Sequence, residues 1–254
     1  MSLAKFSWSR LASHRTREIL SDILLTLGVT ALLFCAWYVW VGDVVAGIRQ
    51  DAASQKLAQS WVTTRELPEF DRNMGDSTGT VVGSAPPVTR PPGIGKAFAT
   101  LIVPRFGKNY ERSIAQSVDV AKVLNNMNTG VGHYVTSDAL GEVGNFALAG
   151  HRTTYGAAFG SIDTLRIGDR IYLETVKGWY IYRFRNMEWA YSSDSTVLNP
   201  VPQLSISPKQ RILTMTTCHP KLSSAERFIA FSVFETFVPR QVGMPAEVAA
   251  LRTR

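Results

Sequence analysis

Apolar residues follow two different patterns along this chain. Residues 23–42 form an uncharged, almost wholly apolar run, roughly the 20 residues that an α-helix needs to cross a bilayer. From about residue 96 to residue 239, apolar residues instead occur in short alternating or β-branched runs separated by Gly, Pro and Asn. The first pattern predicts one membrane-spanning helix, and the second predicts a β-rich domain.

Charges and aromatic residues around the apolar run predict its orientation. Basic residues are more frequent before it than after it (Lys5, Arg10, Arg15 and Arg17 against Arg49 and Lys56). Its far end carries Trp37, Tyr38 and Trp40, whose rings favour the headgroup level of a membrane. We therefore expect residues 1–22 in the cytoplasm and the chain from residue 43 onward outside the cell.

A cleaved signal peptide is the alternative interpretation of this run, because residues 44–46 offer a tolerable cleavage site. However, the apolar run is longer than the 7–15 residues of a usual signal core and ends in bulky aromatic residues. These features favour an uncleaved anchor. Cys35 lies inside the run, where packing is a more natural role than chemistry.

The sequence between the anchor and the β-rich region falls into two parts with different patterns. The first part, from residue 43 to about residue 66, is weakly amphipathic and predicts a helix that continues from the membrane. Residues 67–95 lose periodicity, and the proline-rich stretch from 84 to 93 favours an extended spacer. We expect residues 43–95 to be an extracellular linker, 96–239 the folded domain and 240–254 a basic C-terminal tail.

The region from 96 to 239 predicts an all-β barrel or sandwich with one convincing helical stretch, residues 118–126. The expected strands are 98–103, 145–150, 170–176, 179–191, 210–217 and 228–238.

Charge and cysteine content exclude several classes of function. The net charge is +7, from 27 Lys and Arg against 20 Asp and Glu, and much of the excess lies near the termini. The sequence has no run of like charges and no basic stripe interleaved with aromatic residues, so we expect no nucleic-acid partner. Two cysteines are too few for a disulfide framework or a cysteine-rich zinc site. We expect no metal and no cofactor.

Cys218 is the cysteine of the predicted exported part, and it follows the expected strand 210–217. Arg227 comes nine residues later, where the next expected strand begins. If the two strands are adjacent and antiparallel, Arg227 returns beside Cys218, where a permanent cation can stabilise a thiolate or an oxyanion. A buried structural thiol is the alternative role for Cys218.

A thiol nucleophile also needs a base or counter-ion, which is most often histidine. His151 follows the small-residue strand 145–150 and faces a turn, so it is the favoured partner of Cys218. His219 is adjacent to Cys218, but successive side chains of a strand point to opposite faces. We expect His133, which lies in a predicted loop, to be structural.

Three separated motifs resemble the sortases, membrane-anchored cysteine transpeptidases, and most closely their class E members in actinobacteria. They are IVPRFG at 102–107, NFALAGHRTTYGAAF at 145–159 and TMTTCHPKLSSAER at 214–227. The cysteine motif of the family is T-L-x-T-C, and here Met215 replaces its Leu. The resemblance covers residues 97–238 and includes the N-terminal anchor.

The resemblance implies a closed β-barrel of about eight strands with short helices. It implies Cys218 as the nucleophile, His151 as the group that protonates the leaving amine, and Arg227 as the group that stabilises substrate and oxyanion. It also implies substrate contacts by Thr217, Tyr155 and Tyr134, of which the two tyrosines could equally be packing residues. The expected activity is cleavage of an LPXTG-like signal, and of the LAXTG type for class E, between Thr and Gly.

The expected partners are secreted proteins with a C-terminal sorting signal, an amine of a cell-wall precursor or pilin, and the cytoplasmic membrane. Two other classes of function are considered. An L,D-transpeptidase shares the His-then-Cys order, but the S-x-G-C-x-R type motif of its cysteine is absent from this sequence. A catalytically inactive anchored binding module would lack the three catalytic positions, all of which are filled here.

Overall fold

The computed structural model describes residues 8–63 and 85–252 of the chain. The described chain divides into two compact units, up to Gly42 and from Asp43 onward. Helix α1 (Trp8–Thr63) begins in the first unit and ends in the second. In the described residues, α1 is the one helix long and apolar enough to cross a membrane.

Polar groups in the apolar part of α1 are satisfied within the helix itself. The hydroxyl of Thr26 donates to the carbonyl of Asp22, and the hydroxyl of Thr30 donates to the carbonyl of Thr26, each over 2.7 Å. Such bonds to the preceding turn give each hydroxyl a partner inside the helix. The side chain of Cys35 lies on the exposed surface of this helix.

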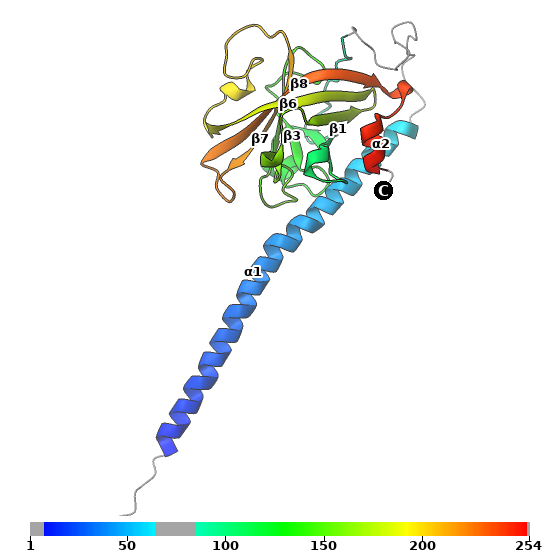
Figure 1. Ribbon diagram of the computed structural model, residues 1–254. Coiled ribbons are helices and arrows are strands. Elements are labelled where there is room, and N and C mark those ends of the chain that lie inside the picture. The colour runs from blue at the N-terminus through cyan, green and yellow to red at the C-terminus, as the bar shows by residue number, and fades with distance from the viewer. Residues whose placement is uncertain (1–7, 64–84, 253–254) are drawn as a thin grey trace, which may run out of the picture. The chain divides into compact units, whose positions relative to one another are not determined.

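The second unit is built on a closed eight-stranded barrel with the strand order β1-β2-β3-β4-β7-β8-β6-β5 (Figure 1). The pairs β2/β3 and β4/β7 are parallel, and the other neighbours are antiparallel. The strands are β1 (Ala97–Ile102), β2 (Glu111–Gln116), β3 (Val131–His133), β4 (Gly144–Gly150), β5 (Arg170–Thr175), β6 (Gly178–Tyr191), β7 (Arg211–His219) and β8 (Glu226–Pro239). The all-β barrel predicted from the sequence is confirmed.

Two strands of the barrel are not predicted by the hydrophobic pattern. In β2, the charged residues Glu111 and Arg112 are buried because ion pairs with Arg252 and Asp51 neutralise them. Strand β3 has three residues, which is too short for an alternating pattern. The expected helical stretch 118–126 contains a π-helix, η3 (Val120–Leu124). Short 3₁₀ turns lie at η2 (Pro104–Phe106), η4 (Ile162–Thr164), η5 (Thr196–Leu198) and η6 (Arg240–Val242).

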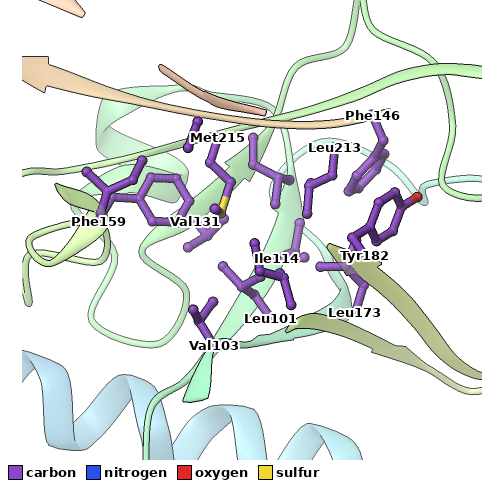
Figure 2. Packing of buried hydrophobic residues seen from close by; sticks show 14 of the residues in the cluster. Leu101, Val103, Ile114, Val131, Phe146, Phe159, Leu173, Tyr182, Leu213 and Met215 are labelled. Carbon is purple, nitrogen blue, oxygen red and sulfur yellow. The ribbon is translucent and has the colours of Figure 1, made fainter. Parts of the chain in front are cut away.

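The barrel interior is filled by apolar side chains from opposite walls (Figure 2). Leu213 and Met215 of β7 point inward, as do Phe146 and Leu148 of β4. Because side chains alternate along a strand, the residues between them point outward. This parity decides which side of the barrel wall each candidate site residue occupies.

The part of α1 from residue 43 to residue 63 packs against the barrel and its loops. Small or polar side chains are buried at every fourth position, Ala46, Gln50, Ser54 and Ala58, and Gly47 is buried beside the first of them. Asp51 forms an ion pair with Arg112 of β2, and Ser54 is hydrogen-bonded to Ser113 over 3.0 Å. The predicted helix is therefore present, but small and polar side chains form its contact with the barrel.

Chain assigned to the linker also packs on the barrel beyond α1. The carbonyl of Pro87 accepts from Tyr180, the carbonyl of Val88 accepts from Lys177 over 2.6 Å, and the Thr89 N–H donates to Leu140 over 2.8 Å. These bonds hold residues 87–89 against β6 and its neighbours instead of leaving them as an extended spacer. Residues 64–84 of the expected linker lie outside the described residues.

The C-terminal segment differs from the expected basic tail because it is folded. Helix α2 (Ala246–Arg252) lies beside the last turns of α1 (Figure 1), and its Val248 is buried. Arg240 and Arg252 both bind Glu174, whose side chain is fully buried, over 2.9 and 2.6 Å. Arg252 also forms an ion pair with Glu111 over 2.7 Å, so two carboxylates neutralise the two positive charges inside the unit.

Candidate active site

Cys218 and Arg227 are directly opposite each other in the barrel wall. Strands β7 and β8 are antiparallel neighbours, and their register pairs Cys218 with Arg227 and Thr217 with Phe228. Phe228 belongs to the interior cluster, so its neighbour Arg227 points outward, as Cys218 does by the same alternation. The expected return of Arg227 beside Cys218 is confirmed.

His151 reaches the same end of the barrel from the other side of β7. Strands β4 and β7 run parallel, with Ala149 opposite Thr216, so two residues further on their ends carry His151 and Cys218. Side chains of β4 alternate with inward Phe146 and Leu148, which places His151 on the outward face. Three adjacent strands thus bring an imidazole, a thiol and a guanidinium to one face at one rim.

The imidazole of His151 has a defined hydrogen-bond partner. Its Nε2 lies 2.8 Å from Oδ1 of Asn125, the residue that ends η3. The amide oxygen can only accept, so Nε2 carries the proton and the other ring nitrogen, Nδ1, is left to exchange protons. Asn125 is not singled out by any sequence motif; it lies near the end of the one predicted helical stretch, which the chain brings back to His151.

Two opposing effects set the pKa of His151. Burial of the half-buried ring lowers its pKa, and the negative charge of Asp43 on α1 raises it. Asp43 is the first charged residue after the apolar run, and the hydrophobic pattern gives no sign of its proximity to His151.

The guanidinium of Arg227 is fixed at the strand end by backbone carbonyls. Its Nη1 donates to the carbonyls of Ser224 and Glu226, each over 3.0 Å. Both Arg227 and Cys218 are half-buried. A partly shielded cation beside a thiol can stabilise negative charge on sulfur or on an oxygen bound nearby.

The other expected substrate-binding residues lie around this rim in different environments. Thr217 is buried and points inward, and its hydroxyl donates to the carbonyl of Gly150 over 2.7 Å, which ties the ends of β4 and β7 together. The hydroxyl of Tyr134 is 2.9 Å from the hydroxyl of Thr216, on the outward face. The ring of Tyr155 is exposed and lies 5.5 Å from the ring of His151.

The remaining histidines of the second unit have structural surroundings. Both ring nitrogens of the buried His133 are bound, Nδ1 to Gln116 over 2.7 Å and Nε2 to Ser137 and Asp138 over 3.1 and 3.2 Å. Burial lowers the pKa of His133 to about 4, so its ring is neutral at pH 7. The ring of His219 stacks on Trp189 with centroids 5.5 Å apart.

The loop after His151 is tied to the body of the unit by a buried arginine. Arg152 forms an ion pair with Asp163 over 3.0 Å and lies over the ring of Phe228 at 5.0 Å from its centroid.

Among the described residues, no cluster of three or more His, Cys, Asp or Glu is arranged to hold a metal ion. The side chains that the strand ends bring to this rim are a thiol, an imidazole and a guanidinium.

Comparison with known proteins shows the family of this chain. A family model described as the Sortase domain matches residues 101–234, so the chain belongs to the sortase family. Sortase SrtE1 of Streptomyces coelicolor is 31% identical over 233 residues, which cover 89% of this chain and 59% of SrtE1. Sortase SrtE2 of the same organism is 28% identical over 222 residues, which cover 84% of this chain and 80% of SrtE2.

Solved structures of sortases have the same fold. The SrtA sortase from Actinomyces oris is 36% identical with a TM-score of 0.61, and the match covers 65% of this chain and 94% of that one. Sortase E from Streptomyces avermitilis is 32% identical with a TM-score of 0.55, covering 61% of this chain and 99% of that one. The present chain spans 59% of the length of SrtE1, so the two differ in overall extent.

Proposed function

We propose that this protein is a membrane-anchored sortase transpeptidase of the class E type, with Cys218 as nucleophile, His151 as general acid and base, and Arg227 as oxyanion stabiliser. The observation that carries this proposal is the convergence of these three side chains on one outward rim, from the ends of β4, β7 and β8. The identity with SrtE1 and SrtE2 supports the class.

The proposed reaction proceeds in two acyl transfers. The thiolate of Cys218 attacks the carbonyl carbon of the signal's Thr, and Arg227 stabilises the resulting oxyanion. The C–N bond to Gly then breaks as the imidazolium of His151 donates a proton to the departing amine, which leaves a thioester. An acceptor amine attacks the thioester, neutral His151 takes its proton, and the thiolate is released.

The thiolate and the imidazolium must coexist for the first step. Burial lowers the pKa of His151 and so disfavours the imidazolium, while Asp43 counteracts this effect. If only a minor fraction of the enzyme holds the active ion pair, turnover is slow.

We assign substrate contacts to Tyr134, Tyr155 and Thr217. Tyr134 and Tyr155 flank the rim on the outward side, where an extended signal peptide can approach Cys218. The side chain of Thr217 is buried and its hydroxyl is bound to the carbonyl of Gly150, so we propose that Thr217 contacts the signal peptide through its backbone groups. We propose LAXTG as the preferred signal. A site that binds the N–H at signal position two loses that bond when Pro arrives, at a cost of roughly 1–3 kcal/mol.

We propose a single-pass membrane topology for the chain. Residues 1–22 lie in the cytoplasm, 23–42 cross the membrane and the barrel is outside, where secreted proteins with a C-terminal sorting signal and a cell-wall or pilin amine meet it. The Lys and Arg excess before the apolar run supports this orientation.

Intact-protein mass spectrometry tests the proposal. The full-length chain is incubated with LAXTG or LPXTG peptides, and we expect an added acyl mass that disappears on addition of an amine acceptor. Cys218→Ala should show no adduct, whereas Cys35→Ala, the matched control, should be acylated like the parent. An adduct that persists in Cys218→Ala, or none with either peptide in the parent, contradicts the proposal.

A further inference from the structure

The loop that follows His151 has an unusual backbone conformation. Four successive residues have positive φ: Thr154 at 65°, Tyr155 at 50°, Gly156 at 85° and Ala157 at 41°. This left-handed region is unfavourable for residues with a Cβ, which crowds the following carbonyl. Such a run persists only where surrounding contacts determine it.

Asp43 of α1 supplies one of those contacts. Its Oδ2 accepts the N–H of Thr154 over 3.0 Å, and its Oδ1 accepts the N–H of Gly156 over 3.2 Å. Backbone N–H groups of a left-handed turn converge to form a concavity that binds anions. Here the anion in this concavity is a side chain of the protein itself.

Gln50, two turns further along α1, supplies the other contact. Its buried Nε2 donates to the carbonyl of Tyr155 over 2.9 Å and to that of Asn126 over 3.2 Å. Tyr155 is in the loop after His151, and Asn126 follows Asn125, the hydrogen-bond partner of His151. One amide group therefore joins the two segments that flank the imidazole.

Two glycines leave the space that Gln50 fills. A Cβ on Gly156 would lie 2.7 Å from Oε1 of Gln50, and a Cβ on Gly130 would lie 2.6 Å from its Nε2. Side chains at these positions would push Gln50 out of its site. The approach of α1 to both loops is therefore close and specific.

We propose that Asp43 and Gln50 are positioning residues of the active site: they hold the left-handed loop 154–157 and thereby fix His151 between Asn125 and the strand end that carries Cys218. This inference rests on the proposed function for its catalytic consequence. In this proposal, the part of α1 that follows the apolar segment helps to build the active site.

Asp43 has a second effect through its charge. The other charged or titratable groups of the neighbouring segments are Arg152 and Tyr155 on the loop after His151, Cys218 on β7, Arg227 on β8, Asp119 at the N-cap of η3 and the exposed Lys122 within it. Burial disfavours the imidazolium form of His151, and the negative charge of Asp43 opposes this effect. Removal of this charge should lower the pKa of His151.

The matched pair Asp43→Asn and Asp51→Asn tests the proposal in the full-length chain in detergent micelles. Both changes remove one carboxylate from the same face of α1. Asp51, however, binds Arg112 and the Glu111 N–H of β2 and does not contact the loop of His151. Each variant is titrated by NMR with ¹³C-labelled histidine, and kcat and KM are measured with the sorting peptide.

We expect Asp43→Asn to lower the pKa of His151 and to reduce kcat about tenfold or more, with KM within about twofold of the parent. Gln50→Ala should also reduce kcat, because it frees both flanking segments while it keeps the charge of Asp43. Asp51→Asn should lower the midpoint of thermal unfolding but leave the His151 titration and kcat near those of the parent.

Two results overturn the proposal. One is an unchanged His151 titration and kcat in Asp43→Asn. The other is an equal change in Asp51→Asn, which would mean that helix docking in general is responsible. If the parent forms no acyl-enzyme with any sorting peptide, the proposed function fails, but the His151 titrations of the two variants still decide whether Asp43 acts on the ring.

Discussion

The hydrogen bond between His151 and Asn125 offers a direct test of how the imidazole is oriented. Nε2 of His151 lies 2.8 Å from Oδ1 of Asn125, which comes from a different part of the chain. In Asn125→Ala the acceptor is lost and the ring is free to rotate away from its observed orientation. The loop otherwise keeps its bonds through the backbone, such as the Asn125 N–H to the carbonyl of Val120 over 2.8 Å.

The expected loss of rate depends on whether the imidazole is charged when it forms this hydrogen bond. In the acylation step the ring is an imidazolium, and hydrogen bonds to charged groups contribute about 1.5–3 kcal/mol. If that contribution is lost in the transition state, kcat/KM falls by about 10- to 150-fold. A bond that served only a neutral ring would give a smaller loss, of roughly 0.5–1.5 kcal/mol.

The assay compares the rates of acyl-enzyme formation in a single turnover. Asn125→Asp keeps the acceptor and adds a negative charge beside the ring, so it should regain most of the rate lost in Asn125→Ala. Asn126→Ala is the matched control. It removes an amide in the same turn that binds Lys122 and Asn128 and does not contact His151. Rates for Asn125→Ala within twofold of the parent, or equal losses in Asn125→Ala and Asn126→Ala, would refute the orientation by this bond.

Two further predictions concern stability. Burial lowers the pKa of His133 to about 4 in the folded protein, below the value of about 6.5 in an unfolded chain. The unfolded chain therefore binds the proton first as the pH falls. The free energy of unfolding should decrease from about pH 6.5 to about pH 4, by at most about 3 kcal/mol from this residue. Urea unfolding should show a shallower decrease for His133→Gln, and an identical slope would contradict the assignment. Glu174→Gln leaves buried cations without their carboxylate, so it should cost about 3–5 kcal/mol and lower the thermal midpoint by about 6–20 °C; a change of less than 2 °C would show that Arg240 and Arg252 find other partners.

Local pattern was sufficient to predict most of the barrel from the sequence. Six strands were predicted within a few residues of their observed bounds, because alternating burial along a strand leaves a period-two signal. Strand β2 lacks this signal, since its buried Glu111 and Arg112 are compensated by partners far away in the sequence. The folding of the C-terminal segment depends on the same kind of distant partner, since Glu174 binds Arg240 and Arg252 and Glu111 supplies the second carboxylate.

The candidate catalytic residues could be singled out in the sequence because each stands at a strand end within a short motif. Antiparallel return of the next strand was enough to place Arg227 opposite Cys218. The sequence itself therefore determined the apolar N-terminal segment, the β-class of the domain and the three candidate catalytic positions. All of these follow from spacing along the chain and from the chemistry of individual side chains.

Only the tertiary structure decided what surrounds His151. Asn125, Asp43 and Gln50 are common polar residues in segments 26 to 108 positions before it, and their contacts depend on how α1 and η3 pack on the barrel. Short-range periodicity reports which face of an element is buried, but a single hydrogen bond between distant loops leaves no periodic trace. The residues that hold the imidazole in place become visible when the closed barrel brings the ends of β4 and β7 to the loops that α1 contacts.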